Sequence, residues 1–295
     1  FSSQLQMSLL PNMEAPAAVV MCYYTGASPS DMEELVTRPL ESAIMSVPGV
    51  DEVSSTSSDG VSQIQITYVE GTDLDIAATK LREQFDRIDA IAEENSIRVL
   101  EAFQDHRVAE GYFAGTTGYG YDDLGRDKLD EIYAQLFGTE AALVRIQFVN
   151  GTHAIACALY GALKTGDVLV SAVGAPYDTL LGVIGAAGNG HGSLKDYGVE
   201  YRQVELKDNK PDLEGMAQAA ADPRVKAVLI QRSKGYSTRA SLSVAEIGEM
   251  CRVIRAANPN AAILVDNCYG EFVETLEPTH VGADLVVGSL IKNPG

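Results

Sequence analysis

The chain has 295 residues, 46% of them hydrophobic, and a formal net charge of −19. That length and apolar content suffice to bury a sizeable core in one or two domains. The negative charge argues against nucleic acid and anionic membranes as partners, because those surfaces are bound by lysine and arginine in excess. The sequence shows neither an apolar run of membrane-spanning length nor a signal-peptide pattern, and its four cysteines lack metal-ligand spacing. We therefore expect a globular chain with free, mostly buried thiols in a reducing compartment.

The first part of the chain, up to about residue 86, is expected to form a small α+β unit. Ser28 can cap a helix whose first turn contains Pro29, and Asp31 completes a capping box. The expected elements are a strand at 13–24, a helix from 29 to about 45, strands at 50–55 and 61–69, and a helix from 72 or 73. This β-α-β-β-α order is typical of a ferredoxin-like unit, and its final strand has no obvious candidate before the sequence changes character.

The second part of the chain alternates helices with short apolar strands. The expected elements are a helix at 128–137, a strand at 142–148, a helix from 152, and strands at 168–172, 227–230, 262–265 and 285–287. This alternation predicts an α/β fold with a mostly parallel sheet and helices on both faces. Ligands of such a sheet bind at the carboxyl ends of its strands. Polar residues recur in the loops at those ends, at 150–153, 174–179, 231–233, 266–267 and 289–292.

The two parts meet without a linker. Residues 81–92 form one helical pattern with no breaker, so the helix that starts near residue 73 is expected to continue into the second part. The join has none of the Gly, Pro or Ser enrichment of a flexible linker. We place the domains at 1–86 and 87–295 and expect the first not to share a core with the second.

The most informative pair of residues is Asp266 and Lys292. Asp266 ends one apolar run, and Lys292 comes just after the next. A lysine amine can form a Schiff base with an aldehyde, and a carboxylate can keep a pyridine nitrogen protonated, so the pair supplies the two protein groups that pyridoxal phosphate needs. Taken singly, Lys292 also fits a solvated loop lysine, and Asp266 fits a turn residue at a strand end.

Six motifs in the first part carry a specific resemblance. They are Leu10–Pro16, Tyr24–Pro29, Val36–Glu41, Pro48–Val50, Ser54–Ser58 and Gly71–Asp75. Together they resemble the first porter subdomain of resistance-nodulation-division efflux permeases, over residues 1 to about 86. The resemblance implies a segment outside the cytoplasmic membrane, beside a substrate channel built from several such subdomains. The segment offers no chemistry by itself.

A second set of motifs runs through the rest of the chain. It comprises Asn150–His153, Gly174–Thr179, Gln231–Ser233, Phe113–Asp123, Gly192–Asp196, Val265–Phe272 and Gly288–Gly295. Taken together and in their order along the chain, the motifs strongly resemble the methionine gamma-lyase-like family, often labelled aluminium resistance protein, from about residue 86 to the end. The resemblance implies a fold-type I pyridoxal phosphate enzyme, a carbon-sulfur lyase of sulfur amino-acid metabolism that is cytoplasmic and homo-oligomeric.

The resemblance assigns roles to individual residues. Lys292 would be the Schiff-base lysine and the acid/base that moves the substrate α-proton, and Asp266 would pair with the pyridinium nitrogen. Gly151 and Thr152 would offer a helix N-terminus to the phosphate, with the Ser289 hydroxyl beside it.

Further roles follow from the same resemblance. Tyr177 would lie over the cofactor and take part in catalysis. From the sequence alone, a tyrosine that serves packing or an interface fits this position equally well. Tyr119 and Tyr121 would reach the phosphate of a neighbouring subunit. Arg232 and Ser233 would lie near the phenolic oxygen of the cofactor or near the substrate.

The ends of the chain and its two resemblances bear on activity. The chain starts at Phe1 and stops in a loop at Gly295, whereas family members continue into a C-terminal domain that supplies an arginine for the substrate carboxylate. We expect weak or no lyase activity, because substrate orientation contributes several kcal/mol to catalysis. The two resemblances imply opposite sides of a membrane, which favours a non-native join of two gene fragments. The alternative function is that of an efflux-transporter fragment.

Overall fold

A computed structural model of the chain describes residues 16–115, 123–188 and 191–292. The chain divides into two compact units, Phe1–Ala90 and Ile91–Gly295. The boundary lies within the helix α3 (Leu74–Asp105). Among the described residues, no helix is both long and apolar enough to cross a membrane.

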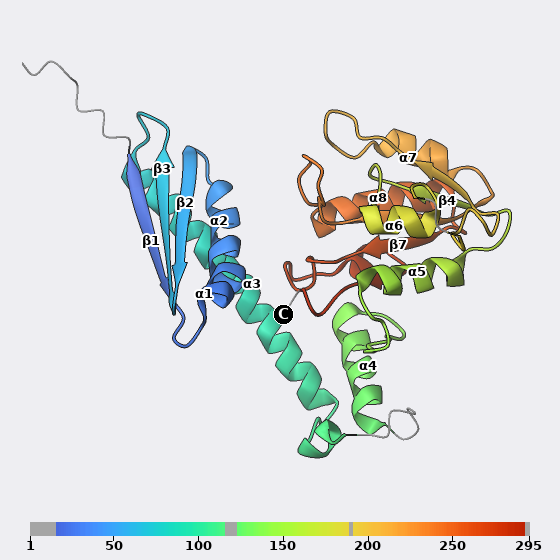
Figure 1. The fold of residues 1–295 in the computed structure, drawn as a ribbon, viewed down its shortest axis with the longest axis horizontal. Coiled ribbons are helices and arrows are strands. Elements are labelled where there is room, and N and C mark those ends of the chain that lie inside the picture. Colours follow the sequence, from blue (N-terminus) through green and yellow to red (C-terminus); the bar gives the residue numbers. More distant parts are fainter. Residues whose placement is uncertain (1–15, 116–122, 189–190, 293–295) are drawn as a thin grey trace, which may run out of the picture. The chain divides into compact units, whose positions relative to one another are not determined.

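The first unit contains a three-stranded antiparallel sheet in the order β1-β3-β2 (Figure 1). Its elements are β1 (Ala17–Tyr23), α1 (Pro29–Asp31), the π-helical segment η1 (Met32–Thr37), α2 (Arg38–Met45), β2 (Val50–Ser58), β3 (Val61–Tyr68) and the start of α3. Alternate residues of β3, among them Ile64, Ile66 and Tyr68, are buried with Ile44 of α2 and Leu81 of α3. Period-two burial of one sheet face under two helices is the core that the sequence predicts for this unit.

Local signals set the ends of the helices as expected. The Ser28 hydroxyl accepts the Asp31 amide at 3.2 Å, and the Asp31 carboxylate accepts the Ser28 amide at 3.2 Å, which completes the capping box. The Asp73 carboxylate accepts the amides of Asp75 and Ile76 and so caps α3. As predicted, α3 then runs without a break to Asp105.

The second unit is built on a parallel five-stranded sheet in the order β5-β4-β6-β7-β8. The strands are β4 (Val168–Ser171), β5 (Glu200–Gln203), β6 (Val225–Gln231), β7 (Ala262–Asp266) and β8 (Leu285–Val287). The strand order reverses at β4, because β5 is added on one side of it and β6 to β8 on the other. This α/β arrangement confirms the predicted fold class, and β3 stays outside this sheet.

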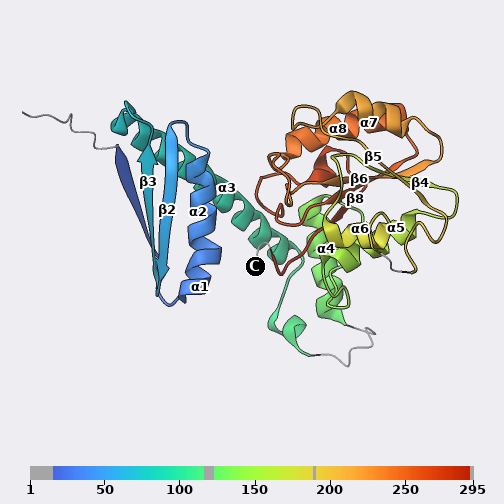
Figure 2. The same cartoon turned by 45° about the horizontal axis from the view of Figure 1, so that its top comes forward.

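Helices cover both faces of the parallel sheet (Figure 2). On one face, α5 (Gly151–Ala162) and α6 (Asp178–Ile184) pack on residues such as Leu229 and Leu264. On the other face, α7 (Leu213–Ala220) and α8 (Val244–Ala257) pack on residues such as Ile230 and Val265. Successive residues of one strand are thus buried on opposite faces of the sheet. This explains why the sequences of β6 and β7 are continuous apolar runs.

A third small core lies beside the sheet. Here Ala102 of α3 packs with Ile132 and Leu136 of α4 (Leu124–Phe137), after the 3-10 turn η2 (Glu110–Phe113). Asn95 and Arg98 of α3 donate hydrogen bonds to backbone carbonyls of residues 272–275. The second unit therefore uses its end of α3 to hold the loop that follows β7.

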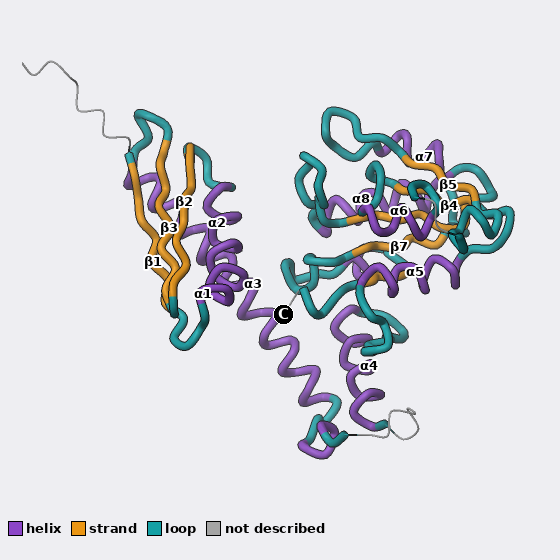
Figure 3. Tube along the Cα trace, viewed as in Figure 1, coloured by secondary structure: helices purple, strands orange, loops and turns teal. Residues whose placement is uncertain are grey.

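The strand expected at 142–148 is wrong, because this segment is a loop (Figure 3). The Asp130 carboxylate accepts the Val144 amide at 2.7 Å and pairs with Arg145. Leu143 and Ile146 are 69% and 90% exposed, so the apolar residues of the segment face no sheet. The Val144 amide thus bonds to the Asp130 side chain of α4 and not to the backbone of a neighbouring strand.

Candidate active site

Polar groups gather at the carboxyl ends of β7 and β8. Asp266, the last residue of β7, is 6% exposed, and its carboxylate accepts the Cys268 amide at 3.1 Å. Burial raises the pKa of Asp266, and hydrogen bonds from Cys268 together with the charge of Lys292 oppose that rise. Lys292, four residues after Gly288, thus exerts its charge on a carboxylate of the neighbouring strand. The structure brings together the two residues that the sequence singled out.

The Lys292 side chain is exposed and lies over an aromatic ring. Its ammonium is 4.7 Å from the centroid of Tyr269, which is a cation–π contact. Tyr269 has φ +71°, in the left-handed region that non-glycine residues rarely adopt. Such backbone strain concentrates at functional sites. Sequence reasoning did not single out Tyr269, because only the turn after β7 brings its ring under the lysine.

The N-terminus of α5 meets the end of β8. The side-chain oxygen of Asn150 accepts a hydrogen bond of 2.9 Å from the His153 amide and so caps the helix. A Cβ atom on Gly151 would lie 3.0 Å from the Cys268 sulfur and 3.7 Å from Ser289 Cβ, so the backbone of Gly151 is close to both residues. This end of α5 carries the positive pole of the helix dipole.

Two threonine hydroxyls lie next to that helix end. The hydroxyls of Thr152, in the first turn of α5, and Thr179, in the first turn of α6, share a hydrogen bond of 2.8 Å. Thr152 is half-buried and Thr179 is exposed. Gly151, Thr152 and Ser289 are therefore grouped around one helix N-terminus, an arrangement that suits an anion such as phosphate.

Tyr177 precedes α6 at the end of the segment that follows β4. Its amide donates to the Gln231 side-chain oxygen at 2.7 Å, which ties it to the end of β6. Its ring stacks on Tyr236, with centroids 5.5 Å apart, and the two hydroxyls lie 3.2 Å apart. The hydrogen bond with Tyr236, followed by the charge of Tyr236, raises the pKa of Tyr177 to about 12, so its phenol keeps its proton at neutral pH. Tyr236 is a second residue that the sequence did not single out.

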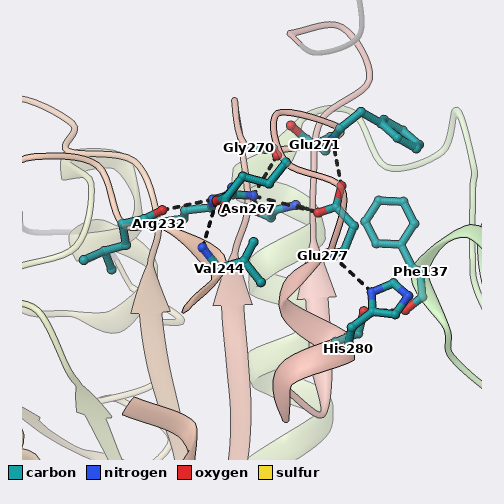
Figure 4. A network of polar contacts seen from close by, with 12 residues as sticks. Phe137, Arg232, Val244, Asn267, Gly270, Glu271, Glu277 and His280 are labelled. Atoms are coloured by element: carbon teal, nitrogen blue, oxygen red, sulfur yellow. Dashed lines mark hydrogen bonds and ion pairs between the residues drawn. The ribbon is translucent and has the colours of Figure 1, made fainter. Parts of the chain in front are cut away.

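Arg232 reaches into the loop after β7, toward Asn267 and Gly270 (Figure 4). Its guanidinium, 4% exposed, donates to Asn267 at 2.8 Å, to the Gly270 carbonyl at 2.7 Å and to Glu274 at 2.6 Å. Glu274 also accepts the amide of Val244, the first residue of α8, at 2.8 Å. These contacts hold the loop in place. The contact with the cofactor or substrate that the sequence predicts for Arg232 stays a prediction.

The remaining expected residues are placed as follows. The backbone carbonyl of Ser233 accepts hydrogen bonds from the side chains of Gln231 and Arg239, and its side chain is half-buried. Tyr119 and Tyr121 lie outside the described residues. Within the ranges that the structure describes, no group of three or more His, Cys, Asp or Glu residues is placed to hold a metal ion.

The carboxylates Glu271 and Glu277 are buried in the same loop. Glu277 accepts the Phe272 amide at 2.7 Å and the Asn267 side-chain amide at 2.9 Å, and its own amide donates to His280 (Figure 4). Burial raises the pKa of Glu277, and it raises that of Glu271 to about 7. Neither role was predicted from the sequence, although Glu271 lies within the motif Val265–Phe272, because both roles depend on how the loop folds back on the sheet.

The chain belongs to the methionine gamma-lyase family, whose sequence model matches residues 72–295. It is 53% identical over 211 residues to the protein YnbB of Bacillus subtilis, a match that covers 71% of this chain and 50% of YnbB. It is also similar to the crystal structure of a candidate cystathionine beta-lyase involved in aluminium resistance from Clostridium acetobutylicum. That match has 49% identity and a TM-score of 0.71, and it covers 74% of this chain and 52% of the other. The chain thus spans about half the length of these relatives.

The N-terminal part is similar to a different family. Residues 2–103 match the sequence model of the AcrB/AcrD/AcrF family. Over 84 residues the chain is 31% identical to the swarming motility protein SwrC of Bacillus subtilis, which covers 28% of this chain and 8% of SwrC. The two family matches overlap at residues 72–103, a stretch that α3 occupies almost completely.

Proposed function

We propose that the second unit is the cofactor-binding part of a pyridoxal phosphate-dependent carbon-sulfur lyase that acts on a sulfur amino acid. The observation that supports this most strongly is the position of Asp266 and Lys292 at the ends of the neighbouring strands β7 and β8, where the charge of Lys292 acts on Asp266. Membership of the methionine gamma-lyase family supports the same reaction class.

The residues around this pair fit the cofactor. A buried carboxylate suits a cationic partner such as a pyridinium nitrogen, because a charge that is buried without one is costly. The helix N-terminus at Gly151, close to Ser289, suits a phosphate. Tyr177 is placed at the end of the segment after β4, tied to the end of β6, and offers an aromatic face. Residues at the carboxyl ends of the strands and at the start of α5 would thus offer partners for the ring nitrogen, the phosphate and the ring face of the cofactor.

Each residue would then perform a defined task. When bound, pyridoxal phosphate supplies an electron sink for negative charge at the substrate α-carbon. The Lys292 amine would hold the aldehyde and later accept the α-proton. Asp266 would keep the ring nitrogen protonated through a charge-assisted contact worth roughly 1.5–3 kcal/mol. Tyr177, whose phenol is protonated, would hold a proton for the departing sulfur.

Trapping with borohydride tests this proposal. Purified chain mixed with pyridoxal phosphate and reduced with borohydride should yield an adduct at Lys292, identified by peptide mapping. An adduct found mainly on another lysine would show that the site is assigned to the wrong residue. The substrate can be assigned by following ketoacid release from methionine, cysteine and cystathionine with a full-length relative, because the family and its structural relatives name both beta- and gamma-lyases.

A further inference from the structure

The carboxylate of Glu271 lies directly on the turn that carries Lys292. Glu271 is 2% exposed, and its Oε1 accepts the Ser289 amide at 2.7 Å. A Cβ atom on Gly288 would be 2.3 Å from the same oxygen, so the carboxylate occupies the space where a side chain at 288 would be. Glu271 and the segment after β8 are therefore fitted to each other.

This contact is the first link of a short chain of contacts to the site. The Ser289 carbonyl accepts the Lys292 amide at 2.9 Å, which closes the turn below the lysine. Ser289 Cβ is also close to Gly151 at the start of α5. An acceptor that fixes Ser289 thus fixes both the base of the lysine side chain and the hydroxyl beside the helix N-terminus.

Several titratable groups act on Glu271 from the elements around it. They are Asp266 of β7, Cys268 and Glu277 of the following loop, and Tyr133 of α4. Burial, and after it the charges of Glu277 and Asp266, raise the pKa of Glu271 to about 7, against the lowering effect of the Ser289 amide. The carboxylate therefore changes charge close to neutral pH, and an ionised acceptor binds an amide more strongly than a neutral one.

We propose that Glu271 is a positioning residue that holds the turn at residues 288–292, and with it the Lys292 amine and the Ser289 hydroxyl, through its hydrogen bond to the Ser289 amide. This inference rests on the proposed function only where it concerns the role of Lys292. The contact itself belongs to the chain without any bound molecule, so it can be tested separately.

Hydrogen exchange of the cofactor-free chain tests the contact. Glu271→Ala should speed exchange of the Ser289 and Lys292 amides by roughly tenfold or more, because it removes a charge-assisted acceptor. Glu271→Gln keeps an acceptor and should restore most of the protection. Glu249→Gln, which changes an exposed glutamate of α8, is the matched control and should leave these amides unchanged. Equal exchange in the parent chain and in folded Glu271→Ala would overturn the proposal.

A pH titration gives a second test that does not depend on the alanine variant folding. The amide resonance of Ser289 in the isotope-labelled, cofactor-free chain should shift with a midpoint near pH 7, as its acceptor is ionised. The shift should disappear in Glu271→Gln. A flat Ser289 signal in the parent chain, or an unchanged titration in Glu271→Gln, would contradict the assignment.

Borohydride trapping links the contact to the lysine. At limiting pyridoxal phosphate, the yield of adduct at Lys292 should fall several-fold in Glu271→Ala and recover in Glu271→Gln, in line with the loss of one charge-assisted hydrogen bond. An adduct that is absent from Lys292 in the parent chain would refute the proposed function and leave the exchange and titration results standing. Equal adduct yields in all three chains would refute the positioning role alone.

Discussion

The two units of this chain use polar side chains in different ways. In the first unit, the hydroxyl of Thr37, the last residue of η1, shares hydrogen bonds of 2.8 and 2.7 Å with the hydroxyls of Ser57 in β2 and Ser62 in β3. In the second unit, the carboxylates and hydroxyls come after strand ends, where parallel strands leave an open edge. Hydroxyls that satisfy one another between a helix and a sheet stabilise packing, whereas charged groups at the carboxyl ends of parallel strands can take part in chemistry. The difference favours the second unit as the place of the proposed chemistry.

The largest effect is expected at Lys292. Lys292→Ala should abolish the borohydride-trapped adduct with pyridoxal phosphate, because it removes the amine that holds the aldehyde. Lys210→Ala, at an exposed lysine in the loop after β5, is the control and should retain the adduct. Mass spectrometry of the reduced protein measures both. If the Lys292 variant retained the adduct, Lys292 would not be the residue that holds the aldehyde, and the proposed site of the second unit would be wrong.

The next largest effect is expected from substitutions that test whether the cores of the two units unfold independently. Ile64→Ala in β3 and Ile263→Ala in β7 each delete a fully buried side chain and should lower the local free energy of unfolding by about 2–5 kcal/mol. Because the first unit has a smaller core and an unpaired edge at β1, we expect weaker protection there at the outset. Hydrogen exchange should show the first substitution acting on β1 to β3 and the second on β6 and β7. Loss of protection in both sheets from either substitution would mean one cooperative core.

A moderate effect is expected from pH. The pKa of Glu271 is about 7 in the folded chain and near 4.5 ordinarily, so the folded chain binds the proton more tightly. The free energy of unfolding should therefore fall as pH rises from about 4.5 to about 7, by up to roughly 3 kcal/mol from this group. Asp266 and Glu277, whose pKa values are also raised, act in the same direction.

Denaturant titrations at several pH values measure this dependence. In Glu271→Gln the fall should be smaller, because one of the three raised carboxyl groups is gone. Glu249→Gln again serves as the control and should show the parent profile. A free energy of unfolding that rises between pH 4.5 and 7 would show that these carboxylates are stabilised in their charged form.

The smallest effect concerns the tyrosine pair. Tyr236→Phe removes one hydroxyl and keeps the stacked ring, so the pKa of Tyr177 should drop from about 12 toward its ordinary value. Resonances of selectively labelled tyrosine can follow the titration. Tyr160→Phe, which alters a tyrosine of α5 outside this pair, is the control and should leave the pKa of Tyr177 unchanged. An unaltered pKa of Tyr177 in the Tyr236 variant would show that the two hydroxyls do not interact.

The sequence predicted those parts of the fold that depend on local pattern. β6, β7 and β8 follow from their apolar runs, and the caps at Ser28 and Asp73 follow from side chains three or fewer residues away. β5 was missed because its residues, Glu-Tyr-Arg-Gln at an edge of the sheet, have no apolar run. The segment at 142–148 has such a run and is no strand.

The site divides in the same way. Asp266 and Lys292 could be singled out because Asp266 ends one recognisable strand and Lys292 comes just after the next. Their positions therefore depend on the sheet. The contacts of Arg232, Tyr269 and Glu271 depend on the fold of the loop after β7, which tertiary hydrogen bonds determine and no periodicity records. The part of the site built by strands was thus predictable, and the part built by that loop was not.

Hydrogen exchange with and without pyridoxal phosphate tests the central claim most directly. The cofactor should slow exchange at residues 151–153, 266–271 and 287–292, and leave residues 17–68 of the first unit unchanged. Protection confined to other segments, or the same protection in Lys292→Ala as in the parent chain, would contradict a cofactor site at the ends of β7 and β8.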